Sequence, residues 1–217
     1  GNYVVGSSSW DNGLTANVGA VTWASGSGMT SGVVSAANSL LGSALNGSLS
    51  FFEIVALKNG NYLIVDSYAP NGGFTSAGAV TWCSGTASTS GVRSASNSLY
   101  GTQSSDRVGS EGVTLLNNGG YVVSSSFWSN GALNAAGAVS FGSDTTGVSG
   151  GINVGNSAFG LQANAGLEPV VVDNVNGTFY ARFLDDGSGR VRVGSQVDGF
   201  KSDASLDTLT SSVGTLS

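Results

Sequence analysis

A repeat of 59 residues limits what this chain can fold into more than any other feature of its sequence. The motif Gly-Asn-Tyr-Val-Val at 1–5 returns in related form at 60–64 and 119–123. The motif Gly-Ala-Val-Thr-Trp at 19–23 returns in the same way at 78–82 and 137–141. Both motifs keep the same shift, with no insertion between copies. A regular repeat of this length predicts units that pack on their neighbours and bury a continuous core.

A fourth copy is present in degraded form near the end of the chain. Its Gly-Thr-Phe-Tyr at 177–180 follows the third start by 58 residues, and 190–193 is its expected partner strand. An atypical last unit is expected, because its outer face meets solvent or a different neighbour. We expect one structural domain made of repeat 1 at 1–59, repeat 2 at 60–118, repeat 3 at 119–176, and a divergent repeat 4 with a closing or donor strand at 177–217.

The local signals within a repeat are those of β-strands. Short apolar runs rich in β-branched residues, such as 113–116 and 121–123, are bounded by Gly and Asn. The Asn-Asn-Gly-Gly sequence at 117–120 favours a hairpin turn, because Asn and Gly tolerate positive φ. About four strands per repeat, buried on both faces, predict an all-β, β-propeller-like fold of about four blades. The alternative is a β-solenoid, in which each repeat makes two or more coils.

The order of the strands and turns carries a resemblance to known families. Apolar strand, Asn-Gly turn, Tyr-Val-Val strand, polar loop and Gly-Ala-Val-Thr-Trp strand resemble the FG-GAP repeat of integrin-like β-propellers. The order is closer still to the Asn-Gly-Asn-Tyr-Val-Val and Gly-Ala-Val-Thr-Trp repeats of large bacterial surface proteins, including filamentous-haemagglutinin-like ones. The resemblance implies a propeller-like fold and an extracellular adhesive or structural role. The first three copies lack the acidic calcium loop of the integrin pattern, so no metal is carried over to them.

Charge and residue content restrict the classes of function. Only 9% of residues are charged, the formal net charge is −6, and 7 of the 217 residues are Lys or Arg. Nucleic-acid binding is disfavoured, because contacts to phosphates depend on clustered basic side chains. No apolar run reaches about 18 residues, so no insertion into a membrane is expected. The chain has no His and one Cys, which removes the commonest general base and thiolate zinc sites, so we expect no enzyme.

The last residues of the chain are candidates for completing a sheet. Repeat 1 begins at its second strand when it is aligned with repeats 2 and 3. The tail resembles the absent strand, with Val213, Thr215 and Leu216 as the strand residues. We expect this strand to close the sheet of its own molecule, or to add to the sheet of a neighbour and so build a filament. The alternative is a frayed terminus, which is common at chain ends.

Aromatic residues at the start of the polar loops are candidates for sugar binding. Trp10 and Trp128 hold equivalent positions in repeats 1 and 3, and Tyr68 lies beside that position in repeat 2. Loop aromatics next to Ser and Asn can stack on surface glycans. The alternative is that these rings pack against the sheet and hold the loop in place.

Two oxygen-rich segments in repeat 4 are candidates for calcium binding. They have the Asp, Asn and Gly content of calcium loops. Ordinary turns explain the same composition, because these residues favour turns without an ion. Apart from calcium, no cofactor is expected. The candidate ligands are Asp173, Asn174, Asn176, Asp185 and Asp186.

These observations together predict a non-enzymatic structural or adhesive β-repeat protein. Low charge and a neutral Ser, Thr and Asn surface permit close packing between copies, so the chain itself is the expected partner, as a homo-oligomer, filament or surface-layer subunit. The alternative is a carbohydrate-binding propeller. The composition is typical of exported bacterial surface proteins, so we expect an extracellular or cell-surface location. A first residue other than Met predicts a processed product or a piece of a longer protein.

Overall fold

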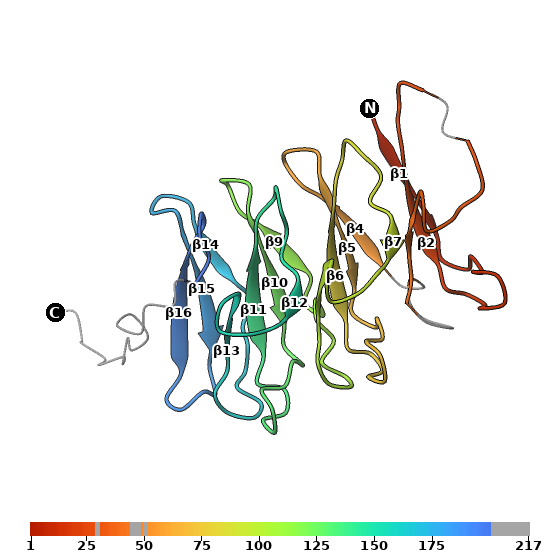
Figure 1. Ribbon diagram of the computed structural model, residues 1–217. Coiled ribbons are helices and arrows are strands. Elements are labelled where there is room, and N and C mark those ends of the chain that lie inside the picture. The colour runs from red at the N-terminus through yellow and green to blue at the C-terminus, as the bar shows by residue number, and fades with distance from the viewer. Residues whose placement is uncertain (29–30, 44–48, 50–51, 201–217) are drawn as a thin grey trace.

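The computed structural model describes residues 1–28, 31–43, 49 and 52–200 of the chain. Within these residues the secondary structure consists of strands β1–β16. The strands form four sheets that follow one another in a row along the chain (Figure 1). The all-β prediction is therefore confirmed. No helix able to cross a membrane occurs in the part of the chain that is described.

The four sheets contain the following strands. The first has β1 (Tyr3–Ser7), β2 (Ala20–Ala24), β3 (Leu40–Leu41) and β7 (Gly91–Val92). The second has β4 (Glu53–Ala56), β5 (Tyr62–Asp66), β6 (Ala79–Cys83), β8 (Ser98–Tyr100) and β12 (Gly150–Gly151). The third has β9 (Val113–Leu115), β10 (Tyr121–Ser125), β11 (Ala138–Gly142) and β13 (Ser157–Phe159). The fourth has β14 (Val171–Asp173), β15 (Thr178–Phe183) and β16 (Arg190–Ser195).

The aromatic residue of the first motif, Tyr in three sheets and Phe in the fourth, lies opposite a small residue of the next strand. A Cβ added to Gly142 would lie 2.2 Å from the Tyr121 ring, so the position opposite that aromatic must stay small. The pairs are Tyr3 with Ala24, Tyr62 with Cys83, Tyr121 with Gly142, and Phe179 with Gly194. Cys83 belongs to this set of small residues, and burial raises the pKa of its thiol to about 12.

The sheets pack face to face, so the inner strands are buried on both sides. In β5, Tyr62 and Ile64 pack in a core shared with the first sheet, whereas Leu63 and Val65 pack in a core shared with the third. Every residue of β5 and of β10 is buried, as expected from their continuous apolar sequence. The first sheet differs, because Val5 in β1 is 47% exposed.

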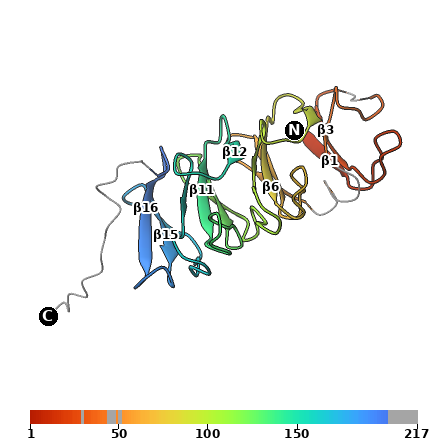
Figure 2. The same cartoon turned by 60° about the horizontal axis from the view of Figure 1, so that its bottom comes forward.

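The described sheets form an open row. Figures 1 and 2 place the first and fourth sheets at opposite ends of the molecule. Closure into a ring and the number of blades therefore stay predictions. The tail residues proposed for closure, Val213, Thr215 and Leu216, lie outside the described residues.

Candidate functional site

The first motif connects repeat 1 to repeat 2 through one carbonyl oxygen. The amide Nδ2 of Asn2 donates to the carbonyl oxygen of Gly85 at 2.8 Å, and the indole Nε1 of Trp23 donates to the same oxygen at 3.0 Å. The side-chain oxygen of Asn2 accepts from the backbone nitrogen of Gly26 within its own repeat. The Asn of the first motif and the Trp of the second motif are therefore residues through which repeat 1 contacts repeat 2.

The same contact recurs between repeats 2 and 3. Asn61 Nδ2 and Trp82 Nε1 donate to the carbonyl oxygen of Asp144, at 2.9 and 2.8 Å. The side-chain oxygen of Asn61 accepts from the backbone nitrogen of Gly85, as that of Asn2 does from its own repeat. The interface between repeats 1 and 2 and that between repeats 2 and 3 therefore have the same hydrogen-bond pattern, because the residues that form it recur with the 59-residue period.

The contact between repeats 3 and 4 is different, and the sequence differs at the same places. Gly120 and Phe141 replace the Asn and Trp of the motifs. The Phe141 ring stacks on the Phe179 ring, with centroids 6.3 Å apart and planes 8° apart. The amide of Asn118 donates to the carbonyl oxygen of Gln196, which takes the place of the earlier backbone acceptor. Repeat 4 is thus joined by stacked rings where the earlier repeats use indole hydrogen bonds.

Repeats 2 and 3 each contribute a two-residue strand to the sheet of the preceding repeat. Strand β7 pairs in parallel with β3, and β12 pairs in parallel with β8. The backbone nitrogens of Gly91 and Arg93 donate to the carbonyl oxygens of Ser39 and Leu41, at 3.1 and 2.9 Å. These exchanged strands join neighbouring repeats by backbone pairing as well as by core packing.

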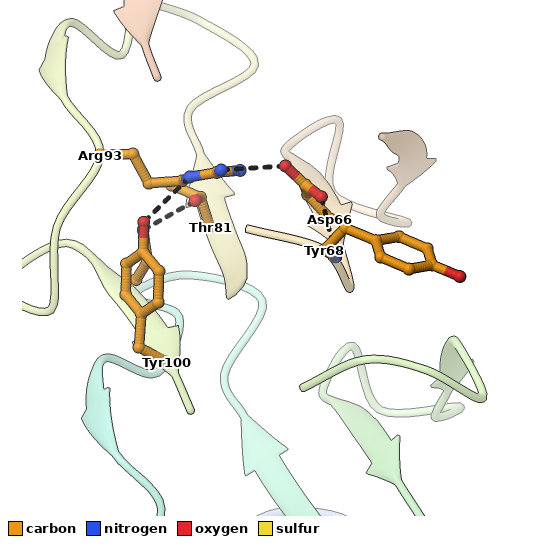
Figure 3. A network of polar contacts seen from close by, with 6 residues as sticks. Asp66, Tyr68, Thr81, Arg93 and Tyr100 are labelled. Atoms are coloured by element: carbon orange, nitrogen blue, oxygen red, sulfur yellow. Dashed lines mark hydrogen bonds and ion pairs between the residues drawn. The ribbon is translucent and has the colours of Figure 1, made fainter. Parts of the chain in front are cut away.

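A buried ion pair lies directly after the exchanged strand β7. Arg93 Nη2 lies 2.9 Å from Asp66 Oδ2, and its Nε donates to the Tyr100 hydroxyl at 3.0 Å (Figure 3). The side chains of the pair are 0% and 1% exposed. Burial raises the pKa of Asp66, an effect that the neighbouring guanidinium opposes. The other Asp66 oxygen accepts from the backbone nitrogen of Tyr68 at 3.1 Å. The network thus connects the exchanged strand to the end of β5.

Sequence reasoning missed this network, although the repeat alignment contains a signal for it. Repeat 2 alone combines an acid, a base and a tyrosine at the three positions. The equivalent residues are Ser7, Val34 and Leu41 in repeat 1, and Ser125, Ile152 and Phe159 in repeat 3. An acid and a base that appear together at apolar or neutral repeat positions indicate a pair that meets in the fold.

Comparison with known families agrees with the repeat structure. A sequence profile for a repeat of unknown function, DUF5650, matches the chain at 1–50, 56–110 and 115–168. The chain belongs to the DUF5650 repeat family. The three matches cover the DUF5650 repeats that contribute the first three sheets, and they end before β14. A search of curated proteins gave no match. The finer resemblance to FG-GAP and filamentous-haemagglutinin-like repeats stays a prediction.

The aromatic residues predicted to bind sugars lie in different environments in the DUF5650 repeats. Trp128 is 5% exposed and packs on Phe159, with ring centroids 5.1 Å apart. Trp10 is partly buried and packs against a small apolar cluster at the end of the first sheet. Tyr68 is 49% exposed. The structure therefore does not bring the three rings to one surface, and of the three Tyr68 presents the most ring to solvent.

The candidate calcium ligands lie at the two ends of β15. The side-chain amide of Asn176 donates to Asp173 Oδ2, and the backbone nitrogens of Asn176 and Val175 donate to Asp173 Oδ1. These hydrogen bonds, that from the Asn176 side chain most of all, lower the pKa of Asp173. Asn174 belongs to the same turn, and its side-chain oxygen accepts from an amide in the turn after β16. The second segment, which begins at Asp185, follows the other end of the strand.

In the second acidic segment, the carboxylate of Asp186 is engaged by contacts within the protein. Asp186 Oδ2 lies 2.7 Å from Arg190 Nε and also accepts from the backbone nitrogen of Leu161. No group of three His, Cys, Asp or Glu residues suited to a metal occurs among the residues that the structure describes. The two candidate segments lie at opposite ends of β15, so either segment would have to bind calcium without ligands from the other. The calcium site stays a prediction.

Replacing Trp82 by phenylalanine tests the hydrogen bond between repeats 2 and 3. We expect the free energy of unfolding to fall by about 1 kcal/mol, because the indole donor to Asp144 is lost while the ring position stays filled. Urea unfolding followed by circular dichroism measures the change. Trp128→Phe is the control for ring contraction, since Trp128 Nε1 has no hydrogen-bond partner among the described residues. Unchanged stability of Trp82→Phe would contradict a role for this bond.

Proposed function

We propose that this chain is a non-enzymatic structural or adhesive β-repeat protein that acts outside the cell or at a bacterial cell surface. Its molecules join end to end by the type of contact that joins its own repeats. The observation that supports it most is the outer face of the first sheet. The inner sheets use the equivalent face to pack against the sheet before them, and in the first sheet no described residue covers it.

The exposed apolar residues of that face support the proposal. Tyr3 and Val5 occupy the positions of Tyr62 and Ile64, which are 4% and 0% exposed because the preceding sheet covers them. In the first sheet the same positions are 50% and 47% exposed. A hollow of about 340 Å³ lies on this face, with both side chains in its wall. The first sheet thus has the surface of an inner sheet without the neighbour.

The segment that other repeats pass to the preceding sheet is also available in repeat 1. It lies at 32–33, and Asn38 Nδ2 donates to the carbonyl oxygen of Val33 at 2.9 Å. Asn97 holds Val92 of β7 by the same bond at 3.0 Å. Val33 is 85% exposed and pairs with no strand in the described part of the chain. Asn38 therefore holds this segment by the same hydrogen bond that Asn97 forms to β7, which pairs with the preceding sheet.

The opposite end of the row presents apolar side chains together with Arg182, which lies two residues after Tyr180 on the same face of β15. In β15 and β16, Tyr180 and Val193 pair with each other at the positions of Val122 and Phe141. The side chains of Phe179 and Ala181 pack in the core shared with the third sheet, so Tyr180 lies on the outer face. A head-to-tail contact between the two end faces is heterologous and does not close on itself, which favours filaments. The low charge of the chain, 9% of residues, weakens repulsion between copies.

Replacing Val5 by aspartate tests this assembly. We expect the wild-type protein to form filaments in negative-stain images and large species in sedimentation velocity. Val5→Asp should remain monomeric, because it places an unpaired charge in an apolar contact. Leu14→Asp is the matched control, since Leu14 lies fully exposed in a loop and should leave assembly unchanged. A wild-type protein that stays monomeric, or filaments that persist in Val5→Asp, would overturn the proposal.

A further inference from the structure

Three side chains from separate loops form a polar and aromatic cluster on the surface. The guanidinium carbon of Arg107 lies 5.0 Å from the ring centroid of Tyr68 and 5.1 Å from that of Phe127. The two aromatic residues hold the same position in repeats 2 and 3, and they are 49% and 46% exposed. Arg107 lies in the connection between those repeats. We call these three residues the Arg107 cluster.

The backbone at Arg107 favours glycine over the residue that is present. Its φ is +46°, in the left-handed region that residues with a side chain seldom adopt. The equivalent position in the next repeat is Gly166, with φ +68°. Arginine thus stands where the turn alone would favour glycine. The surrounding structure holds this conformation, as it does at Ala135, where φ is +49°.

The guanidinium of Arg107 has unused donors. Among the described residues it forms no ion pair and no hydrogen bond, and its contacts are with the two rings. The nearest acids in sequence are engaged elsewhere. Asp106 is buried and accepts from the backbone nitrogens of Thr102, Gln103 and Ser129. Glu111 accepts from Ser110 Oγ and from Ser126. A guanidinium held against ring faces keeps its N–H edges for an oxyanion, and carboxylate is the planar group that matches their geometry.

A groove with three serines in its wall lies close to the cluster along the chain, although none of the three cluster residues lines it. It has a volume of about 620 Å³, and its wall includes Ser67, Ser110 and Glu53. Ser67 directly precedes Tyr68, and the backbone nitrogen of Ser110 donates to the carbonyl oxygen of Arg107 at 2.9 Å. A volume of this size fits a small oligosaccharide. Serine hydroxyls and a carboxylate are suitable partners for sugar hydroxyls.

We propose that the Arg107 cluster and this groove bind an oligosaccharide that carries a single carboxylate sugar. The carboxylate pairs with the N–H edges of Arg107, and the sugar ring lies against the exposed part of Tyr68 or Phe127. The neighbouring neutral sugars occupy the groove. One carboxylate matches one guanidinium, whereas a polyanion would be repelled by the net charge of −6 and by Glu53. This role goes beyond the assembly of molecules and uses a different surface.

The test compares 3′-sialyllactose, a trisaccharide with one carboxylate, with its neutral parent lactose. Titration calorimetry on the whole protein should show saturable binding of sialyllactose and much weaker binding of lactose. Arg107→Gly should weaken sialyllactose binding about tenfold or more, because a charge-assisted pair is lost. The same variant should be at least as stable as the wild type, since it removes the left-handed arginine.

Two further variants separate the parts of the site. Tyr68→Ser copies the residue at that position in repeat 1, Ser9, and should weaken sialyllactose binding with no change in folding. Arg107→Lys keeps the charge and should retain part of the affinity. The proposal is overturned if the wild type binds sialyllactose no better than lactose, or if Arg107→Gly binds it as well as the wild type. Neither result bears on filament formation, which depends on the end faces.

Discussion

Replacing Arg93 by isoleucine, the residue at the same position of repeat 3, is expected to lower the free energy of unfolding by about 3–5 kcal/mol. The substitution leaves the Asp66 carboxylate, which is 1% exposed, without its cationic partner. It also removes the donor to the Tyr100 hydroxyl. The melting temperature of a chain of this size should fall by roughly 10 °C, which circular dichroism during heating measures.

A variant that carries the repeat 3 residues at all three positions is the matched control. Asp66→Ser, Arg93→Ile and Tyr100→Phe together remove both charges and leave a set of side chains that the same fold already accommodates in repeat 3. We expect the triple variant to regain most of the lost stability, because a buried ion pair is often replaced by packed neutral residues at little cost. A single variant as stable as the wild type would contradict this reading. A triple variant as unstable as the single one would assign the loss to packing and not to the unpaired charge.

The sequence predicts much of the fold because local signals repeat with one period. The apolar runs and Asn-Gly turns predict the hairpins, and β5 and β10 pair as those signals require. The partners of β7 and β12 could not be predicted in this way. Each strand is two residues long and contains Gly, so its sequence carries little preference for any sheet. Its partner is set by the packing of the preceding repeat, which local sequence does not record.

The candidate sites were less predictable than the fold, for a related reason. Trp10 and Trp128 hold the same repeat position, yet their burial depends on what packs above them, and Phe159 covers Trp128 in repeat 3. The ion pair joins Asp66 and Arg93 across 27 residues. Spacing within one repeat cannot show such a contact. A comparison of repeats position by position can indicate it, because charges that differ from every other copy need a partner.

Replacing Gly78 by alanine is expected to cost about 3 kcal/mol or more in the free energy of unfolding. Gly78 has φ +79°, and a Cβ on it would lie 2.1 Å from the backbone nitrogen of Val108. That neighbour is backbone, so it cannot move aside as a flexible side chain would. Glycine stands at the equivalent position of each of the first three repeats, at 19, 78 and 137, with positive φ in every case. Chemical unfolding compared with the wild type measures the loss.

Gly72 in the same loop supplies the control that separates the two causes. Its φ is +58°, but nothing lies within 4 Å of a Cβ built there. Gly72→Ala should therefore cost only the left-handed conformation, about 1–2 kcal/mol. The excess in Gly78→Ala then measures the close approach of the Gly-Ala-Val-Thr-Trp strand to the connection that leads to repeat 3. Equal losses in the two variants would show that conformation alone requires glycine in the motif, and that the backbone contact at Val108 relaxes freely.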